Sequence, residues 1–192
     1  AGGCPQKYVT GAFVEGKLAA QSAAAYAGSL DDFGHNSLAE KDIVAQVEHL
    51  LIKDNAEDSP FSTEDLEEAM QQVMDEYAGG ISTGYRYTES QLDIASKHIA
   101  RLTKLSHGLR GKDNYQLLKI FELQERLLIC RVLIAHLQAR KETRWHSFAE
   151  NLDYPAKDAA FEGYINSRLE QGNIKIIQRQ LVGRGEHYEH QH

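Results

Sequence analysis

Residues 114–140 decide the fold, and they read NYQLLKIFELQERLLICRVLIAHLQAR. Apolar side chains recur in this stretch every three or four residues, which predicts an α-helix. The apolar positions are Leu117, Leu118, Ile120, Phe121, Leu123, Leu127, Leu128, Ile129, Val132, Leu133, Ile134 and Leu137. They are too many for a single stripe, so we expect a helix that is buried on more than one side, with Cys130 as a small member of the core.

Three segments before this helix also have apolar residues at helical spacing. They cover residues 37–53, 62–78 and about 88–110. The second opens with Ser62 followed by acidic residues, which is typical of a capped helix start, and Gly79-Gly80 ends it. Gly111 ends the third. Because the connections between the last three helices are short, we expect an antiparallel, up-down bundle.

The amino-terminal part of the chain predicts one more helix. Residues 10–27 are rich in alanine, a strong helix former, with Thr10 as a possible cap and Gly28 as a stop. Small residues at its start would let an anionic group approach the free backbone N–H groups, where the helix dipole favours negative charge. On composition alone, a helix packed in a core is the commoner explanation.

The composition limits the class of protein. With 192 residues, of which 42% are hydrophobic, the chain can bury one good core. A net charge of −7 without any block of lysine and arginine argues against a nucleic-acid partner. No apolar run approaches the roughly twenty residues of a transmembrane helix, so we expect no membrane span.

The cysteines and histidines predict no metal site. Cys4 and Cys130 are far apart and lack ligand spacing, so neither a disulfide framework nor an iron–sulfur site can be built from this chain alone. A reducing, cytoplasmic setting fits this pattern. The three histidines of the tail, within residues 185–192, have no neighbouring core to orient them as ligands, and we expect this tail to be flexible.

The segment after the long helix reads as irregular chain followed by β-structure. Glu142 and Arg144 are placed either to pair or to face a neighbouring surface. Asp153-Tyr154-Pro155 predicts a turn, because proline restricts the residue before it to extended conformations. Residues 160–165 can form a short helix or strand, and after a turn at Gly172-Asn173 the branched residues of 174–182 predict the one clear strand.

Two motifs in this segment resemble a known family. Lys141 to His146 read KETRWH, and Asp153-Tyr154-Pro155 follows within about a dozen residues. This combination resembles the adenylylsulfate reductase flavoproteins, within the wider fumarate reductase and succinate dehydrogenase flavoprotein family. Glu142, Arg144 and the Asp-Tyr-Pro turn carry the resemblance, and the pairing of Arg144 with Trp145 favours the sulfur-metabolism branch.

A third stretch is similar to the turn that closes the flavin domain in this family and presents a helix start to the flavin ring. It comprises residues 10–13 together with Glu15-Gly16. The cofactor-binding residues that the resemblance implies are Thr10, Gly11, Ala12 and Phe13. The chain lacks a Gly-x-Gly-x-x-Gly fingerprint after a strand, so most of an FAD site would lie outside these residues.

The resemblance also implies residues that neutralise a small anionic substrate or the flavin anion. These are Lys7 and Arg144. Gln6 occupies a position where the family carries a histidine, and glutamine stays neutral and can only form hydrogen bonds. Without the resemblance, Lys7 is equally well explained as a solvated surface amine.

Together these features predict a mainly α chain that is the carboxy-terminal portion of a longer polypeptide. Residues 1–36 would be the end of an FAD-binding domain, residues 37–140 a helical bundle, and residues 141–192 a return segment with one strand and a flexible tail. The resemblance implies an FAD-dependent oxidoreductase that interconverts adenylylsulfate with sulfite and AMP. It also implies an iron–sulfur subunit as the electron-transfer partner.

Two other functions remain open on the sequence. A fumarate- or succinate-type enzyme of the same superfamily would use the same flavin on a dicarboxylate. An isolated, noncatalytic helical docking module is consistent with every periodicity described above, and it would have no affinity for flavin.

Overall fold

The chain divides into two compact units, residues 1–45 and residues 46–192. The computed structural model describes residues 8–29, 37–51, 60–144 and 149–181. Helix α1 (Tyr8–Ser29) belongs to the first unit, and α2 (Ser37–Leu50) crosses the boundary between the two. The mainly helical fold predicted from the sequence is confirmed.

Helix α1 is the alanine-rich helix expected near the amino terminus. It begins at Tyr8, so Thr10 lies in its first turn and the predicted cap at Thr10 is wrong. The strong helix propensity of the alanines extends the helix beyond the first polar residue that could have capped it. All of its described side chains are exposed, including the large apolar ring of Phe13, which is 76% exposed.

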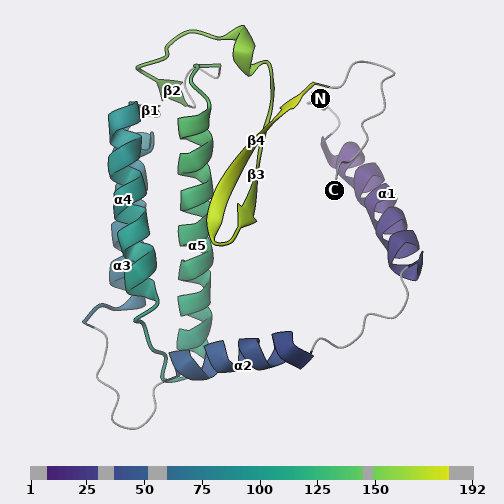
Figure 1. Ribbon diagram of the computed structural model, residues 1–192, viewed down its shortest axis with the longest axis vertical. Coiled ribbons are helices and arrows are strands. Elements are labelled where there is room, and N and C mark those ends of the chain that lie inside the picture. The colour runs from purple at the N-terminus through teal and green to yellow at the C-terminus, as the bar shows by residue number, and fades with distance from the viewer. Residues whose placement is uncertain (1–7, 30–36, 52–59, 145–148, 182–192) are drawn as a thin grey trace. The chain divides into compact units, whose positions relative to one another are not determined.

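Helices α3 (Thr63–Tyr77), α4 (Glu89–Ser106) and α5 (Asn114–Ala139) pack against one another in the second unit. Figure 1 shows α4 and α5 side by side, running in opposite directions. Ser62 and Thr88 cap α3 and α4 in reciprocal capping boxes, each with the residue three positions later. The bundle is therefore built from helices whose ends the sequence itself specifies.

Helix α4 ends earlier than its apolar pattern predicts. The helix stops at Ser106, and Leu109 is buried in the core although it lies outside the helix. The turn then brings Gly111 against α2, where the Gly111 N–H donates to the Leu50 carbonyl at 2.8 Å. A Cβ at Gly111 would lie 3.0 Å from the backbone nitrogen of Leu117, so this close approach favours glycine.

Helix α5 supplies the centre of the core from one face. Its buried residues are Leu117, Ile120, Leu123, Leu127 and Ile134. Leu118, Ile129 and Leu133 are exposed, so the helix is less fully enclosed than its many apolar positions predict. Helices α3 and α4 pack against α5. A hairpin formed by residues 163–180, later in the chain, also packs against α5. Among the described helices, none is both long and apolar enough to cross a membrane.

Two small sheets complete the second unit. Strand β1 (Arg86–Tyr87) pairs in parallel with β2 (Glu150–Asn151). Strand β3 (Gly163–Glu170) pairs antiparallel with β4 (Asn173–Gln180). The predicted strand near the carboxyl end is confirmed as β4, but the prediction of a single strand is wrong. Gln171 and Gly172 both have positive φ, 48° and 78°, as a two-residue hairpin turn requires, and this turn brings β3 beside β4.

The one-sided burial of α5 can be tested by two leucine-to-alanine substitutions. Leu123 is 0% exposed, so Leu123→Ala should lower the free energy of unfolding by about 3 kcal/mol through lost burial and a new cavity. Leu118 is 55% exposed, and Leu118→Ala should cost under about 0.5 kcal/mol. Urea unfolding followed by circular dichroism measures both, and equal losses would contradict the structure.

Candidate functional site

The predicted site residues fall in different parts of the chain. Lys7 lies outside the described residues. Thr10 and Gly11 occupy the first turn of α1, and the side chains of Ala12 and Phe13 are exposed on that helix. Arg144 lies in the second unit, after α5. The site that can be built from described side chains is therefore the one around Arg144.

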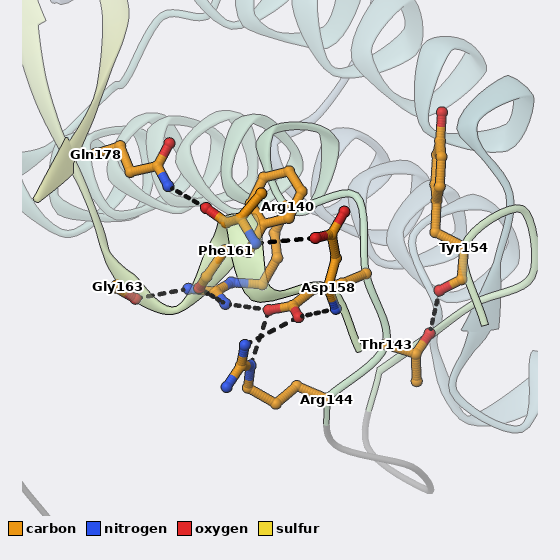
Figure 2. A network of polar contacts seen from close by, with 10 residues as sticks. Arg140, Thr143, Arg144, Tyr154, Asp158, Phe161, Gly163 and Gln178 are labelled. Carbon is orange, nitrogen blue, oxygen red and sulfur yellow. Dashed lines mark hydrogen bonds and ion pairs between the residues drawn. The ribbon is translucent and has the colours of Figure 1, made fainter. Parts of the chain in front are cut away.

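Arg144 is held by the buried carboxylate of Glu142. Its Nε and Nη2 donate to the two Glu142 oxygens at 2.8 and 3.0 Å, a bidentate pairing. Arg140 Nη1 donates to Glu142 Oε1 at 2.5 Å, and the Asp158 N–H donates to Oε2 at 2.9 Å. Figure 2 labels Arg140, Arg144 and Asp158, the three residues that bind this carboxylate, and the Glu142 side chain is 0% exposed. We refer to Arg140, Glu142, Arg144 and the Asp158 amide as the Glu142 cluster.

The end of α5 explains why the cluster forms there. The helix ends at Ala139, and Arg140 has an extended backbone, so the chain leaves the helix axis at this residue. The Arg140 guanidinium also donates to the carbonyls of Phe161 at 3.1 Å and Gly163 at 3.2 Å. One side chain thus joins the end of α5 to the start of β3 (Figure 2).

The cluster fixes the charge states of its members. The hydrogen bond from Arg144 lowers the pKa of Glu142 to about 2, with further contributions from the Asp158 amide and Arg140, although burial acts in the opposite direction. The Glu142 carboxylate in turn raises the pKa of Arg144. Glu142 is therefore ionised at neutral pH, and it is unsuited to act there as a general acid or base.

Thr143, the residue between the two partners, anchors the same segment to the chain that follows. It is 1% exposed, and its hydroxyl donates a hydrogen bond to the Tyr154 carbonyl at 2.9 Å. The same hydroxyl accepts a hydrogen bond from the Asn151 N–H at 3.0 Å, and its own N–H donates to the Ala156 carbonyl at 3.1 Å. These bonds hold the segment after α5 against strand β2 and the turn that follows it.

The Asp-Tyr-Pro turn has a structural role in this arrangement. The Asp153 carboxylate accepts a hydrogen bond from the Glu89 N–H at 2.7 Å, at the amino end of α4, where negative charge is favoured. The Glu89 carboxylate accepts from Asn151 at 2.8 Å and from Lys141 at 2.9 Å. The Lys141 ammonium also lies 5.2 Å from the centre of the Tyr154 ring. The motif therefore ties the return segment to the start of α4.

A cavity of about 220 Å³ lies beside the Glu142 cluster. Its wall includes Tyr87, His136, Arg140, Glu142, Arg144 and Ile165. Two guanidinium groups face one carboxylate in this wall, which suits an anion better than a cation. Among the described residues, no group of three or more histidine, cysteine, aspartate or glutamate side chains is arranged to hold a metal ion.

Sequence reasoning found only part of this site. It identified Glu142 and Arg144 as a possible pair, which the structure confirms. It missed Arg140, although an arginine in the last turn of a helix is a recognisable partner for carbonyl and carboxylate oxygens. It also missed Tyr87, because a two-residue strand gives no alternation of apolar and polar residues that could reveal it.

Comparison with known proteins gives a consistent result. No protein-family model matches the chain. It is 29% identical over 97 residues to the adenylylsulfate reductase subunit alpha of Megalodesulfovibrio gigas, a match that covers 50% of this chain and 15% of that protein. The adenylylsulfate reductase structure from Archaeoglobus fulgidus superposes with a TM-score of 0.77 and 25% identity, covering 98% of this chain and 32% of that one. The chain resembles the C-terminal part of an adenylylsulfate reductase alpha subunit.

Two further structures extend the comparison. An adenosine-5-phosphosulfate reductase in complex with sulfite superposes with a TM-score of 0.76 and 26% identity, again over 98% of this chain and 32% of that one. The E. coli quinol fumarate reductase superposes with a TM-score of 0.68 at 17% identity, covering 82% of this chain and 26% of that one, which shows a shared fold. This chain thus spans about a third of the length of the adenylylsulfate reductase structures that it matches.

The charge of Glu142 should make stability depend on pH in a recognisable way. Its folded pKa of about 2 lies below the ordinary value of 4.5, so its contribution is complete above about pH 5 and is lost as the pH falls toward 2. At pH 7, Glu142→Gln should lower the free energy of unfolding by about 3 kcal/mol, because it leaves two arginines without their buried counter-charge.

The measurement is urea unfolding of wild type and variant from pH 7 to pH 2, and the difference between them should shrink over the acidic part of this range. Glu64→Gln is the matched control, because Glu64 pairs with Lys119 at an exposed position and should matter far less. A difference that stays constant down to pH 2 would show that Glu142 is not held as an ion.

Proposed function

We propose that this chain is the C-terminal part of an FAD-dependent oxidoreductase subunit that interconverts adenylylsulfate with sulfite and AMP. The observation that carries the proposal is the superposition of 98% of the chain on two reductases of this class at 25% and 26% identity. One of those two enzymes is in complex with sulfite. The Megalodesulfovibrio gigas alpha subunit adds support from sequence alone.

Residues 10–13 of α1 would form a small part of the flavin site. Gly11 and Ala12 are small residues at the start of a helix of 22 residues, and Ala12 is exposed. Because α1 begins at Tyr8, the N–H groups that have no partner within the helix and favour an anionic neighbour lie before Gly11, and the small size of Gly11 and Ala12 would leave room for that neighbour. By this proposal, Thr10, Gly11, Ala12 and Phe13 would face the flavin, and other sequence would bind most of the FAD. When bound, FAD supplies the two-electron redox chemistry.

Arg144 and Lys7 would provide positive charge for the small anionic substrate. The Glu142 carboxylate keeps the Arg144 guanidinium in one orientation through two hydrogen bonds. A guanidinium held in this way loses little further freedom when it meets an oxyanion. Gln6, beside Lys7, would contribute hydrogen bonds without taking up a proton.

The proposal includes a domain arrangement and a partner. Residues 1–36 would complete the flavin domain, residues 37–140 the helical bundle, and residues 141–192 the return toward the flavin. An iron–sulfur subunit would exchange electrons with the flavin one at a time. Arg140, Arg144 and Glu142 together carry one net positive charge, and this charge would face the small anionic substrate.

A dicarboxylate oxidoreductase is the second candidate. It is favoured by the fold shared with the quinol fumarate reductase, whose TM-score is 0.68. Both candidates use the same flavin and differ in the anion that they reduce or oxidise. The lower sequence identity of that match, 17% against 25% and 26%, places it second.

The test uses the complete polypeptide that carries these residues, purified anaerobically with its copurifying partner. Oxidised flavin absorbs near about 450 nm, and this band should bleach when sulfite and AMP are added together. One matched reductase holds sulfite as a covalent adduct, and an adduct of sulfite with the flavin would itself bleach the band. The reaction is therefore scored by the adenylylsulfate that forms, which should require both compounds. Bleaching by succinate instead would favour the dicarboxylate enzyme. A band that none of these compounds changes would reject both.

A pair of lysine variants tests the role of Lys7. Lys7→Gln should slow the bleaching at limiting sulfite, because it removes a positive charge from the proposed anion site. Lys17→Gln, at an exposed position of α1, should leave the rate unchanged. Equal rates in wild type and both variants would remove Lys7 from the site.

A further inference from the structure

Arg140 contacts both the Glu142 carboxylate and the start of the β3–β4 hairpin. Its Nη1 donates to Glu142 Oε1 at 2.5 Å and to the Phe161 carbonyl at 3.1 Å. Its Nη2 donates to the carbonyl of Gly163, the first residue of β3, at 3.2 Å. A planar guanidinium binds three acceptors in this way only while all three keep their places. The position of the Glu142 carboxylate is therefore linked to the position of the hairpin start.

The orientation of Arg144 depends in turn on that carboxylate. Its Nε and Nη2 both donate to Glu142, at 2.8 and 3.0 Å. Glu142 Oε1 accepts from Arg140 and Arg144 together, so a shift of Arg140 changes the acceptor that Arg144 uses. The Asp158 N–H, which also holds the carboxylate, belongs to the segment just before β3. The Arg144 side chain keeps 29% of its surface exposed, so other rotamers are open to it once this pairing loosens.

We propose that Arg140 is a positioning residue that makes the orientation of Arg144 depend on how the start of β3 packs against the end of α5. We call this link, from the start of β3 through Arg140 and Glu142 to Arg144, the Arg140 relay. A movement of the hairpin start would loosen the guanidinium that is to meet the substrate. The consequence for the substrate rests on the proposed function, whereas the relay itself rests on contacts within this chain.

Arg140→Lys tests the first step of the relay, because lysine keeps the positive charge but lacks the planar fork. The Arg144 Nε–H is observed by NMR in the 192-residue chain, where its donation to Glu142 protects it from hydrogen exchange. Its exchange should become about tenfold faster in the variant, as expected for the loss of one hydrogen bond to a charged group. Arg126→Lys, at an exposed position of the same helix, is the matched control and should leave this exchange unchanged.

Two glycine substitutions test the dependence on the hairpin. A Cβ at Gly163 would lie 2.7 Å from the Arg179 carbonyl, so Gly163→Ala displaces the hairpin start without changing a side chain of the Glu142 cluster. The exchange of the Arg144 Nε–H should again become about tenfold faster. Gly172→Ala is the matched control, because Gly172 lies at the hairpin turn with positive φ and gives its carbonyl to Arg131 of α5 at 2.9 Å. It strains the hairpin at its other end and should leave Arg144 unchanged.

Thermal unfolding of every variant is measured alongside, and exchange is compared at a temperature where all of them are folded. The proposal is overturned if Arg140→Lys leaves the Arg144 exchange unchanged, or if Gly163→Ala and Gly172→Ala change it equally. If Arg140→Lys does not fold, the glycine pair carries the test alone.

Turnover of the complete polypeptide separates the relay from the proposed function. Arg140→Lys should raise the KM for sulfite more than it changes kcat, because Arg140 acts on the orientation of an anion-binding group. Faster exchange at Arg144 with an unchanged KM would contradict the role of Arg144 toward the substrate and leave the relay standing. Unchanged exchange would remove the relay whatever the enzyme does with adenylylsulfate.

Discussion

The second unit depends on the buried carboxylate of Glu142. An ion placed out of contact with water must be paired and fully hydrogen-bonded, or it destabilises the fold. Here Arg140 approaches from the end of α5, Arg144 from four residues further along the chain, and the Asp158 amide from the segment before β3. Because all three must converge on the same two oxygens, the path of the chain after α5 is fixed.

The need to pair the buried Glu142 helps explain why the residues of the family motif, Glu142, Arg144 and the Asp-Tyr-Pro turn, occur together. Glu142 holds the arginine, and Asp153 binds the Glu89 N–H at the start of α4. The residues that made the sequence recognisable thus include several whose contacts are structural. Arg144 has a structural contact and a second one that bears on function. It pairs with Glu142 in the Glu142 cluster, and it also lines the cavity beside that cluster. The proposed role of Arg144 toward the substrate depends on its place in the cavity wall, whereas the fold depends on its pairing with Glu142.

The sequence predicted what depends on near neighbours along the chain. Helical spacing located α3, α4 and α5, and the cap at Ser62 was predicted from the acidic residues that follow it. Features that need distant partners were missed. The exposed face of α5, the pairing of β3 with β4 and the position of Tyr87 each depend on which segments fold back against that helix. Within the site, the Glu142–Arg144 pair could be predicted because the two residues are only two positions apart, while the roles of Arg140 and Tyr87 became visible only in three dimensions.

Amide hydrogen exchange at Asp158 tests the central claim most directly, because this N–H donates to Glu142 at 2.9 Å. The measurement compares wild type with Glu142→Gln by NMR at neutral pH. The account predicts that exchange at Asp158 and in the neighbouring return segment approaches the unprotected rate in the variant, while the amides of α4 and the middle of α5 lose only the protection that the lower global stability removes. Unchanged exchange at Asp158, or an equal loss of protection throughout the bundle, would contradict a role for Glu142 in fixing the return segment.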